Sequence, residues 1–348
     1  MNYEKFHNKG LTGLVNLGNT CYINSSLQVL SHVPEFNEYI GTVIDVDKNN
    51  KNNNDINDIF LSEWYDLYKL IWSKNCIISP NRFLRVIQST SKQKENCAFI
   101  GYDQNDSTEF LYFILQIFHD SLKNHKDSHI LLDKIIKMQH SESFSSFLRD
   151  RHKNEYSIID ALFSTYTKID IVDDETNKVL ATNYENFYLL DLAMSMTNSQ
   201  YSLDNCLKHY FSDEKMNKEN DNQYYDDKEK KYKNVTKKVR LMATSKYIVL
   251  QLKRWNMNLK KNQRIVHYDN CSIHFEDYLH EDAKENINYT YELFGIINHS
   301  GNVFGGHYFS YIKGFNGKWY EFNDTMVHEI SDSKLLSNKN YCFIYRRK

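Results

Sequence analysis

Four polar residues, far apart along the chain, have the types that thiol chemistry requires. Cys21 follows the polar loop GLVNLGNT, His307 follows two glycines, and Asn323 and Asp324 end the stretch WYEFND. A thiolate can attack a carbonyl carbon, an imidazole can move the proton, and a side-chain oxygen can hold the imidazole in one tautomer. These residue types indicate nucleophilic acyl transfer, provided that the fold brings them together.

The surroundings of Cys21 leave two interpretations open. Asn19 and Thr20 are good helix caps, and YINSSLQVL repeats apolar residues at helical spacing, so we expect Cys21 in the first turn of a helix. The dipole and the free N–H groups of a helix start favour a thiolate. A lone cysteine is more often a buried packing residue, and its position alone favours that alternative.

His307 begins an amphipathic strand, HYFSYIK, directly after Gly305 and Gly306. Paired glycines allow another backbone, such as an extended substrate, to approach closely. The Asn-Gly pair at residues 316–317 is a strong two-residue hairpin signal, and the returning strand would bring Asn323 and its neighbour beside His307. The alternative is that His307 simply caps a strand, because spacing alone does not establish its contact with Cys21.

The elements that must position these residues change in type along the chain. Apolar spacing is mostly helical from Cys21 to about His152, and aromatic, β-branched stretches such as YIVLQLKRW follow after about Ser157. This predicts an α+β layout with a cleft between the two halves. Two polar segments, Asp45 to Asp58 and Asp213 to Lys233, are expected to be exposed loops.

Composition does not suggest nucleic-acid binding or membrane association, although neither is excluded locally. Hydrophobic residues make up 41% of the 348 residues, enough for a sizeable core, and the net charge of −2 gives no nucleic-acid or membrane footprint. The start, MNYEKFHNKG, carries no apolar signal region, and no apolar run approaches the roughly 20 residues of a membrane span. Six irregularly spaced cysteines favour free thiols in a reducing compartment, cytoplasmic or nuclear.

Four stretches resemble the motifs of the ubiquitin-specific proteases, a papain-like family of cysteine peptidases. GLVNLGNTCYINSSLQ resembles their cysteine box, and GGHYFSYIK with WYEFND resembles their histidine box. GYDQNDSTEFL resembles their glutamine–aspartate–glutamate helix start, and YIVLQLKRW their lysine–arginine–aromatic strand, with Trp255 where phenylalanine is usual. The resemblance runs from about Gly10 to the C-terminus, and several long motifs in the family's order argue against chance.

The resemblance implies one α+β, papain-like catalytic domain over residues 11–348. Its expected parts are a helical thumb at 11–155, β-rich fingers at 156–245 and an antiparallel β palm at 246–348. Residues 1–10 would be a short N-terminal extension.

By resemblance, Cys21 is the nucleophile, His307 its general base and Asn323 the third member of the triad. Asp324 is a second candidate for orienting the imidazole or stabilising the transition state, because an amide cannot neutralise an imidazolium as a carboxylate would. Asn16 matches the family's oxyanion residue, acting with the backbone N–H of Cys21. Without the match, Asn16 would be taken as a turn residue.

The resemblance also implies residues that bind the substrate. Asp106 and Glu109 match acidic positions that receive the arginine-containing tail of ubiquitin, although both also suit a helix N-terminus. Gly305 and Gly306 fit a narrow channel that admits a Gly-Gly tail and rejects side chains. His299 matches a position lining the cleft, though more weakly.

The implied function is a deubiquitinating thiol isopeptidase. It would hydrolyse the bond after the C-terminal Gly-Gly of ubiquitin through a thioester, on ubiquitinated proteins or polyubiquitin, as a monomer and without a cofactor. One alternative is a catalytically weak scaffold that binds ubiquitin. Another is an isopeptidase for a ubiquitin-like modifier that ends in Gly-Gly.

One departure from the family concerns metal. Many members carry two Cys-x-x-Cys pairs that bind zinc in the fingers, whereas this chain has no such pair and only Cys206 between residues 158 and 242. We therefore expect no metal, and fingers that are degenerate or stabilised by packing alone. The cysteines other than Cys21 are expected to be ordinary buried or half-buried thiols: Cys76, Cys97, Cys206, Cys271 and Cys342.

Overall fold

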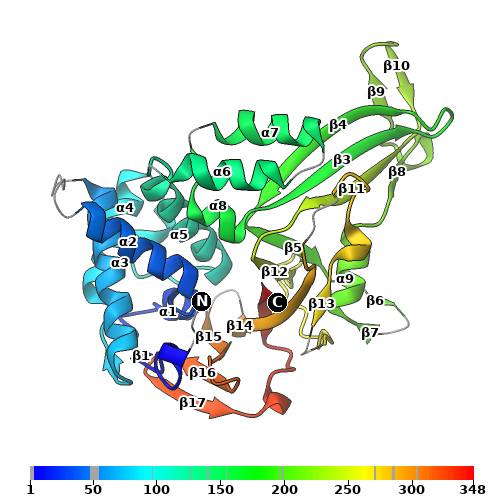
Figure 1. The fold of residues 1–348 in the computed structure, drawn as a ribbon. Helices are drawn as coiled ribbons and strands as arrows, with labels where there is room; N and C mark the ends of the chain where they lie inside the picture. The colour runs from blue at the N-terminus through cyan, green and yellow to red at the C-terminus, as the bar shows by residue number, and fades with distance from the viewer. Residues whose placement is uncertain are drawn as a thin grey trace.

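The protein has three parts, visible in Figure 1: a group of helices, a long arm of strands with a small hairpin at its tip, and a curved sheet beneath them. The computed structural model describes residues 4–47, 55–95, 97–125, 127–138, 141–153, 155–194, 196–197, 200–269, 272–283, 287–302 and 305–348. Residues 48–54 of the first expected loop, and Cys271, lie outside the described residues, and the side chain of Cys97 is not described.

The helical part, the thumb, comes first in the chain. Its helices are α1 Cys21–Ser31, α2 Pro34–Asp47, α3 Ile56–Ser73, α4 Asn81–Gln93, α5 Ser107–Leu122, α6 Ser128–Lys137, α7 Glu142–His152 and α8 Ile158–Phe163. Helix α5 contacts α1, α3 and α8 and is buried along most of its length. It begins where expected, because the Asp106 carboxylate accepts the backbone N–H groups of Thr108 and Glu109 and caps it.

The palm is an eight-stranded sheet whose strands run in the order β17-β16-β15-β14-β18-β12-β5, with β13 paired to β14. These strands are β5 Leu189–Ala193, β12 Tyr247–Lys253, β13 Ile273–His274, β14 Thr290–Asn302, β15 Gly305–Lys313, β16 Trp319–Asn323, β17 Met326–Ile330 and β18 Asn340–Arg347. The antiparallel palm is confirmed for every pair except β5 and β12, which are parallel. Strand β5 lies in the range expected for the fingers yet belongs to this sheet.

The predicted hairpin between β15 and β16 exists, but the prediction that its turn has two residues was wrong. Lys313 pairs with Trp319, so the loop covers residues 314–318. It is closed by the Gly314 N–H donating to the Lys318 carbonyl, and Gly317 adopts a φ of +81° inside it. The Asn-Gly pair therefore marked the correct reversal in a longer loop.

The fingers form a second sheet with strand order β4-β3-β11-β8, and a separate hairpin, β9-β10, lies at its tip. Their bounds are β3 Thr165–Asp173, β4 Val179–Phe187, β8 Glu214–Met216, β9 Tyr224–Asp226, β10 Lys231–Lys233 and β11 Val235–Ala243. The segment Asp213 to Lys233, expected to be an exposed loop, thus contributes β8 and the fingertip hairpin.

The fingertip is held by a group of opposite charges, here called the Lys233 cluster: Lys233, Asp173, Asp226 and Glu229. The Lys233 ammonium lies 2.8 Å from Asp226, 2.7 Å from Glu229 and 3.4 Å from Asp173. Hydrogen bonding to Lys233 holds the pKa of Asp226 at about 2. The expectation of fingers held by packing alone was wrong, because the two signs of charge in this segment pair with each other.

Both aspartates of the Lys233 cluster also shape turns. One oxygen of Asp173 and one of Asp226 each accept two backbone N–H groups from the residues that follow. No metal ion fits between these carboxylates, because the ammonium already occupies that position and would repel a cation. Within the described ranges, no group of three or more His, Cys, Asp or Glu side chains is arranged to hold a metal.

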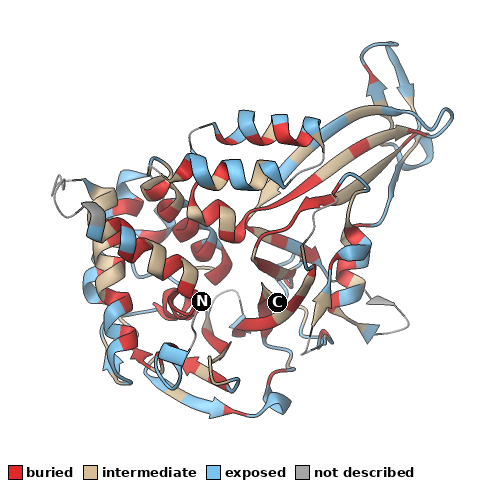
Figure 2. Cartoon of the chain, viewed as in Figure 1, coloured by how far each residue is buried: buried red, intermediate tan, exposed pale blue. Residues whose placement is uncertain are grey.

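The core has three regions, and Figure 2 shows the buried residues concentrated where thumb, palm and finger base meet. One region fills the space between the thumb helices and the palm, a second lies on the palm's other face under α9 Leu203–Tyr210, and a third joins α6 and α7 to the finger base. Among the described thiols outside the site, Cys206 and Cys342 are buried and Cys76 is half-buried, as expected, and they form no disulfide. No helix in the described part of the chain is long and apolar enough to span a membrane.

Candidate active site

Cys21 is the first residue of α1 and is almost completely buried, with 4% of its surface exposed. The preceding loop bends into it through positive φ angles at Gly18 and Asn19. The prediction of a cysteine in the first helical turn is therefore confirmed. Its sulfur faces a cleft of about 200 Å³ between the thumb and the palm.

His307, on β15, is brought to this sulfur from the other half of the chain. Its Nε2 lies 2.7 Å from Oδ1 of Asn323 on the adjacent strand β16. Because a carbonyl oxygen only accepts, Nε2 carries the proton, and Nδ1 is left for the sulfur. A hydrogen bond with Cys21, aided by the bond to Asn323, raises the pKa of His307 to about 9 despite partial burial.

Asp324 does not bond the imidazole. It lies in the turn between β16 and β17 with a φ of +51°, and its carboxylate points toward the cysteine loop. Oδ2 accepts a hydrogen bond from Nδ2 of Asn16 at 2.9 Å, and Oδ1 accepts one from Nδ2 of Asn24 at 2.8 Å. The structure therefore places Asp324 beside the predicted oxyanion residue, where its charge reaches His307 only through space.

The side chain of Asn16 is fixed at both ends. Its Oδ1 accepts the backbone N–H groups of Gly18 and Thr20, at 3.1 and 3.0 Å, and one N–H of its Nδ2 donates to Asp324. The second N–H remains for a ligand. An amide held in this way is a preorganised donor for a developing negative charge.

The turn that carries Asp324 is docked tightly against the cysteine loop. The Leu14 N–H donates to the Asp324 carbonyl, and any side chain at Gly13 would collide with the Thr325 backbone. Asn24 on α1, which the sequence analysis did not single out, secures the same turn. Asn24 is one of several buried polar residues in α1, and nothing in the local sequence identifies its partner 300 residues away.

Asp106 holds the thumb to the palm. Besides capping α5, its second oxygen accepts the hydroxyls of Tyr308 on β15 and Tyr341 on β18. The tyrosine hydroxyls join the start of a thumb helix to two palm strands. Asp106 is therefore a structural clamp on the wall of the cleft, in addition to contributing its charge there.

Gly306 and His299 form one wall of the cleft. The His299 Nε2 lies so close to Gly306 that a Cβ there would overlap it, whereas a Cβ at Gly305 would meet nothing within 4 Å. Lys261 donates to Nδ1 of His299 at 2.8 Å, which places the His299 proton on Nε2, toward the cleft. Burial, followed by the charge of Lys261, lowers the pKa of His299 to about 4 and keeps it neutral.

Glu109 leads from the cleft into an acidic groove. It is exposed, and it lines a pocket of about 500 Å³ together with Asp191 and Gln251. Partial burial and the charge of Asp106 raise the pKa of both Glu109 and Asp191. Asp191 lies on β5, and the sequence analysis missed it because only the pairing of β5 with β12 brings it beside α5.

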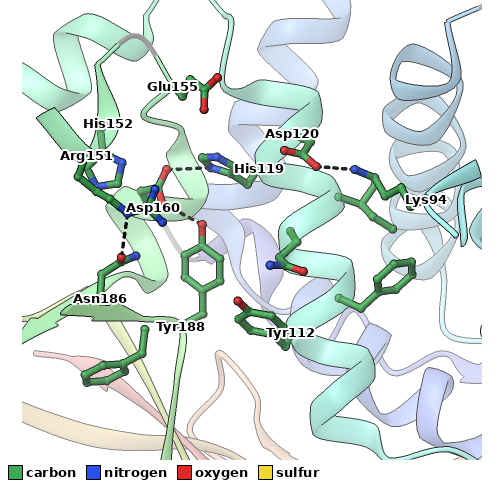
Figure 3. A pocket seen from close by; sticks show the side chains of 14 residues that line it. Lys94, Tyr112, His119, Asp120, Arg151, His152, Glu155, Asp160, Asn186 and Tyr188 are labelled. Carbon is green, nitrogen blue, oxygen red and sulfur yellow. Dashed lines mark hydrogen bonds and ion pairs between the residues drawn. The ribbon is translucent and has the colours of Figure 1, made fainter. Parts of the chain in front are cut away.

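A larger pocket, of about 520 Å³, lies farther along, where α5, α7 and α8 meet the base of the fingers. Figure 3 shows the Asp160 carboxylate at its centre, bonded to His119 and to the Tyr188 hydroxyl. Lys94 pairs with Asp120 at its rim, also shown in Figure 3. Its charged groups are largely paired and its described lining includes no cysteine, so we assign the chemistry to the Cys21 cleft.

Comparison with known proteins shows which family the chain resembles. A profile of the ubiquitin carboxyl-terminal hydrolase family matches residues 12–345. Ubiquitin carboxyl-terminal hydrolase 2 of Bos taurus is 28% identical, over 97% of this chain and 55% of the bovine protein. A probable ubiquitin carboxyl-terminal hydrolase of Acanthamoeba polyphaga mimivirus is 26% identical, over 97% of this chain and 90% of the viral protein. This chain thus spans about half the length of the bovine protein.

Solved structures show the same fold. The SAGA Ubp8/Sgf11/Sus1/Sgf73 deubiquitinating module bound to ubiquitin aldehyde matches with a TM-score of 0.73 and 23% identity, over all of this chain and 72% of the matched chain. A module bound to monoubiquitin matches equally well, at 22% identity and over 71% of its chain. The predicted α+β papain-like fold is confirmed, and with the profile match over nearly its whole length, the chain belongs to the ubiquitin carboxyl-terminal hydrolase family.

Proposed function

We propose that this chain is a deubiquitinating thiol isopeptidase that hydrolyses the bond after the C-terminal Gly-Gly of ubiquitin. The observation that carries the proposal is the placement of His307 between the buried thiol of Cys21 and the amide of Asn323. Family membership supports the same chemistry. We assign the activity to a single catalytic domain at residues 11–348, with a thumb, fingers and palm near the expected boundaries apart from α8 and β5, which lie in the range expected for the fingers.

The first half of the reaction forms a thioester. His307 first takes the thiol proton of Cys21, and the raised pKa of the imidazole favours this transfer. The thiolate attacks the carbonyl carbon of the terminal glycine, and the carbonyl oxygen becomes an oxyanion. The C–N bond to the lysine amine then breaks, and the imidazolium gives its proton to the leaving nitrogen.

The second half releases ubiquitin. Neutral His307 takes a proton from water, the hydroxide attacks the thioester carbon, and the C–S bond breaks to give the carboxylate and Cys21. In both halves, Asn16 donates its free N–H to the oxyanion together with the backbone N–H of Cys21. Asp324 keeps the Asn16 amide in place through the bond at 2.9 Å. No step requires a cofactor.

The substrate tail enters along the acidic groove. Glu109 and Asp191, with the charge of Asp106 behind them, suit a tail that contains arginine. Gly306 is packed so closely against His299 that a side chain there would not fit, and it lines the same narrow cleft as Cys21. We infer that Gly305 contributes by its exposed, unobstructed backbone rather than by a tight fit.

A specific observation gives weight to one rival, a scaffold that binds ubiquitin without turnover. Gln104 accepts the Gly306 N–H at 3.0 Å and thereby bridges the cleft from thumb to palm. A tail that entered beside Gly306 would have to displace this contact. The complete set of Cys21, His307, Asn323 and Asn16 opposes the rival, because binding alone requires none of these groups.

Turnover of a fluorogenic amide at the C-terminus of ubiquitin, and of an isopeptide-linked ubiquitin dimer, tests the proposal. We expect both to be cleaved by the monomeric chain under reducing conditions, and neither by Cys21→Ala. A modifier that ends in Gly-Gly but lacks arginine in its tail should be cleaved much more slowly. A folded parent that binds ubiquitin without turnover would establish the scaffold instead, and preference for the other modifier would overturn the assignment of ubiquitin.

A further inference from the structure

The side chain of Asn323 works in only one of its two orientations. Its Oδ1 accepts the Nε2–H of His307, which leaves Nδ1 unprotonated for Cys21 in the neutral ring. A flipped amide would present its N–H groups to Nε2. The ring would then carry its proton on Nδ1, where it cannot accept a proton from the thiol or from water, and an imidazolium would lose its acceptor.

Glu321 provides the contact that distinguishes the two ends of this amide. It precedes Asn323 by two residues on β16, so both side chains lie on one face of the strand. The Asn323 Nδ2 donates to Glu321 Oε1 at 3.2 Å. A carboxylate only accepts hydrogen bonds, so it binds the nitrogen end of the amide and disfavours the oxygen end.

Side chains of the two adjacent strands flank Glu321. His328, directly opposite on β17, places Nε2 3.9 Å from the carboxylate. On the other side, Tyr311 of β15 pairs with Glu321, and burial followed by the Glu321 charge raises the pKa of Tyr311 to about 12. The Glu321 side chain is only 16% exposed, so water competes little with the amide.

We propose that Glu321 is a positioning residue for the reaction: it fixes the orientation of the Asn323 amide and thereby the tautomer of His307. The inference rests on the proposed function, because it concerns the base of that reaction. It also explains how a triad with an amide as third member obtains an anion. The negative charge belongs to Glu321, which contacts the Asn323 amide and acts on the His307 imidazole through that amide.

A double-mutant cycle separates this role from a merely structural one. With Asn323 present, Glu321→Ala should lower kcat about tenfold with little change in KM, since the bond it removes joins an amide to a charged group. Asn323→Asp replaces the amide with a side chain whose two oxygens are equivalent. In that background Glu321→Ala should cause no loss, or a gain, because it removes a like charge.

Two further variants act as controls. Glu321→Gln keeps an oxygen that can accept from Asn323 but loses the charge, so it should retain more activity than Glu321→Ala. Glu329→Ala removes a glutamate from neighbouring β17 that pairs with Lys318 and is 52% exposed, and it should leave kcat unchanged. Equal loss from Glu321→Ala in the parent and in the Asn323→Asp background, or no loss in either, would overturn the proposal.

A second readout does not depend on turnover. Nitrogen NMR of the His307 ring near neutral pH, in a Cys21→Ala background, should show the proton on Nε2. Adding Glu321→Ala should shift the ring toward a mixture of tautomers, whereas adding Glu329→Ala should not. An unchanged tautomer would contradict the positioning role even if the parent protein were inactive, so this failure is distinguishable from a failure of the proposed function.

Discussion

At the scale of single residues, the site depends on side chains that hold other side chains. Asn16 is fixed by backbone donors and by Asp324, and His307 by Asn323. Of the two roles expected for Asp324, orienting the imidazole is not seen, because its carboxylate bonds Asn16 and Asn24. A role in stabilising the transition state stays a prediction. Asn323 thus contacts the proposed base, whereas Asp324 contacts the proposed oxyanion residue.

The pKa of His307 should depend on the thiol of Cys21. Its pKa is raised to about 9 chiefly by the hydrogen bond with Cys21, so Cys21→Ala should return it toward the ordinary value of about 6.5. An NMR titration of the ring C–H signals measures both proteins. Equal pKa values in parent and variant would show that the thiol and the imidazole do not interact.

The oxyanion role of Asn16 predicts a selective loss. Asn16→Ala should lower kcat by about 10²–10³, with little change in KM, because the donated hydrogen bond strengthens as charge develops on the carbonyl oxygen. Steady-state kinetics with the ubiquitin amide measure it. A rise in KM at constant kcat would instead assign Asn16 to binding of the ground state.

How much of the site could be predicted from sequence is clearest at this scale. Cys21 and His307 stood in distinctive local patterns, and the pairing of His307 with Asn323 follows from a hairpin. Asn24 and Asp191 could not be predicted, because their roles arise from contacts between segments that are far apart in the sequence. Glu321 could not be predicted either, because a charged residue in a strand gives no sign of which side chain it will bond.

At the scale of elements, the fingertip shows how charge can replace an apolar core. The β9-β10 hairpin has exposed tyrosines on its outside, and the Lys233 cluster lies where it joins β3. A sequence with both signs of charge looks like a solvated loop. Only the fold shows that one lysine is 9% exposed and meets three carboxylates.

Removing that lysine should loosen the fingertip. Lys233→Met leaves the three carboxylates facing one another, so amide hydrogen exchange at residues 224–233 should accelerate by about tenfold or more. Lys231→Met is a matched control, since Lys231 is 57% exposed and, within the described part of the chain, its ion pair is with Glu229 alone. If both variants exchanged like the parent, the cluster would contribute nothing to the hairpin. A chelator should leave the exchange of the parent unchanged.

At the scale of the whole molecule, the thumb is tied to the palm by polar contacts around the site. Asp106 bonds Tyr308 and Tyr341, and Glu35 of α2 bonds Lys246 and Tyr247 at the start of β12. The order of helices and strands, and the presence of a cleft between the two halves, could be predicted from periodicity. The parallel pairing of β5 and the closing contacts could not, because they depend on how the sheet and the helices meet.

Stability should fall on both sides of neutral pH. Burial lowers the pKa of His32 and His152 to about 4, so the folded state binds fewer protons than the unfolded chain, and stability is lost as pH falls from about 6.5 to 4. Fully buried His32 alone contributes about 1.4 kcal/mol per pH unit in that window. The raised pKa of His307 has the opposite sign, and its contribution is lost as pH rises from about 6.5 through 9.

Urea unfolding at pH 5, 7 and 9.5 checks this dependence. The free energy of unfolding should be greatest at pH 7. A value at pH 5 equal to or above that at pH 7 would show that these histidines are not buried in the neutral form.

The most direct test of the central claim is the intact mass of the protein after mixing with ubiquitin that bears an electrophilic C-terminus. The account predicts one ubiquitin-sized adduct on the parent and none on Cys21→Ala. It also predicts that the adducted peptide contains Cys21. A folded parent that remains unmodified, or an adduct that persists in Cys21→Ala, would contradict the assignment of this thiol as the nucleophile.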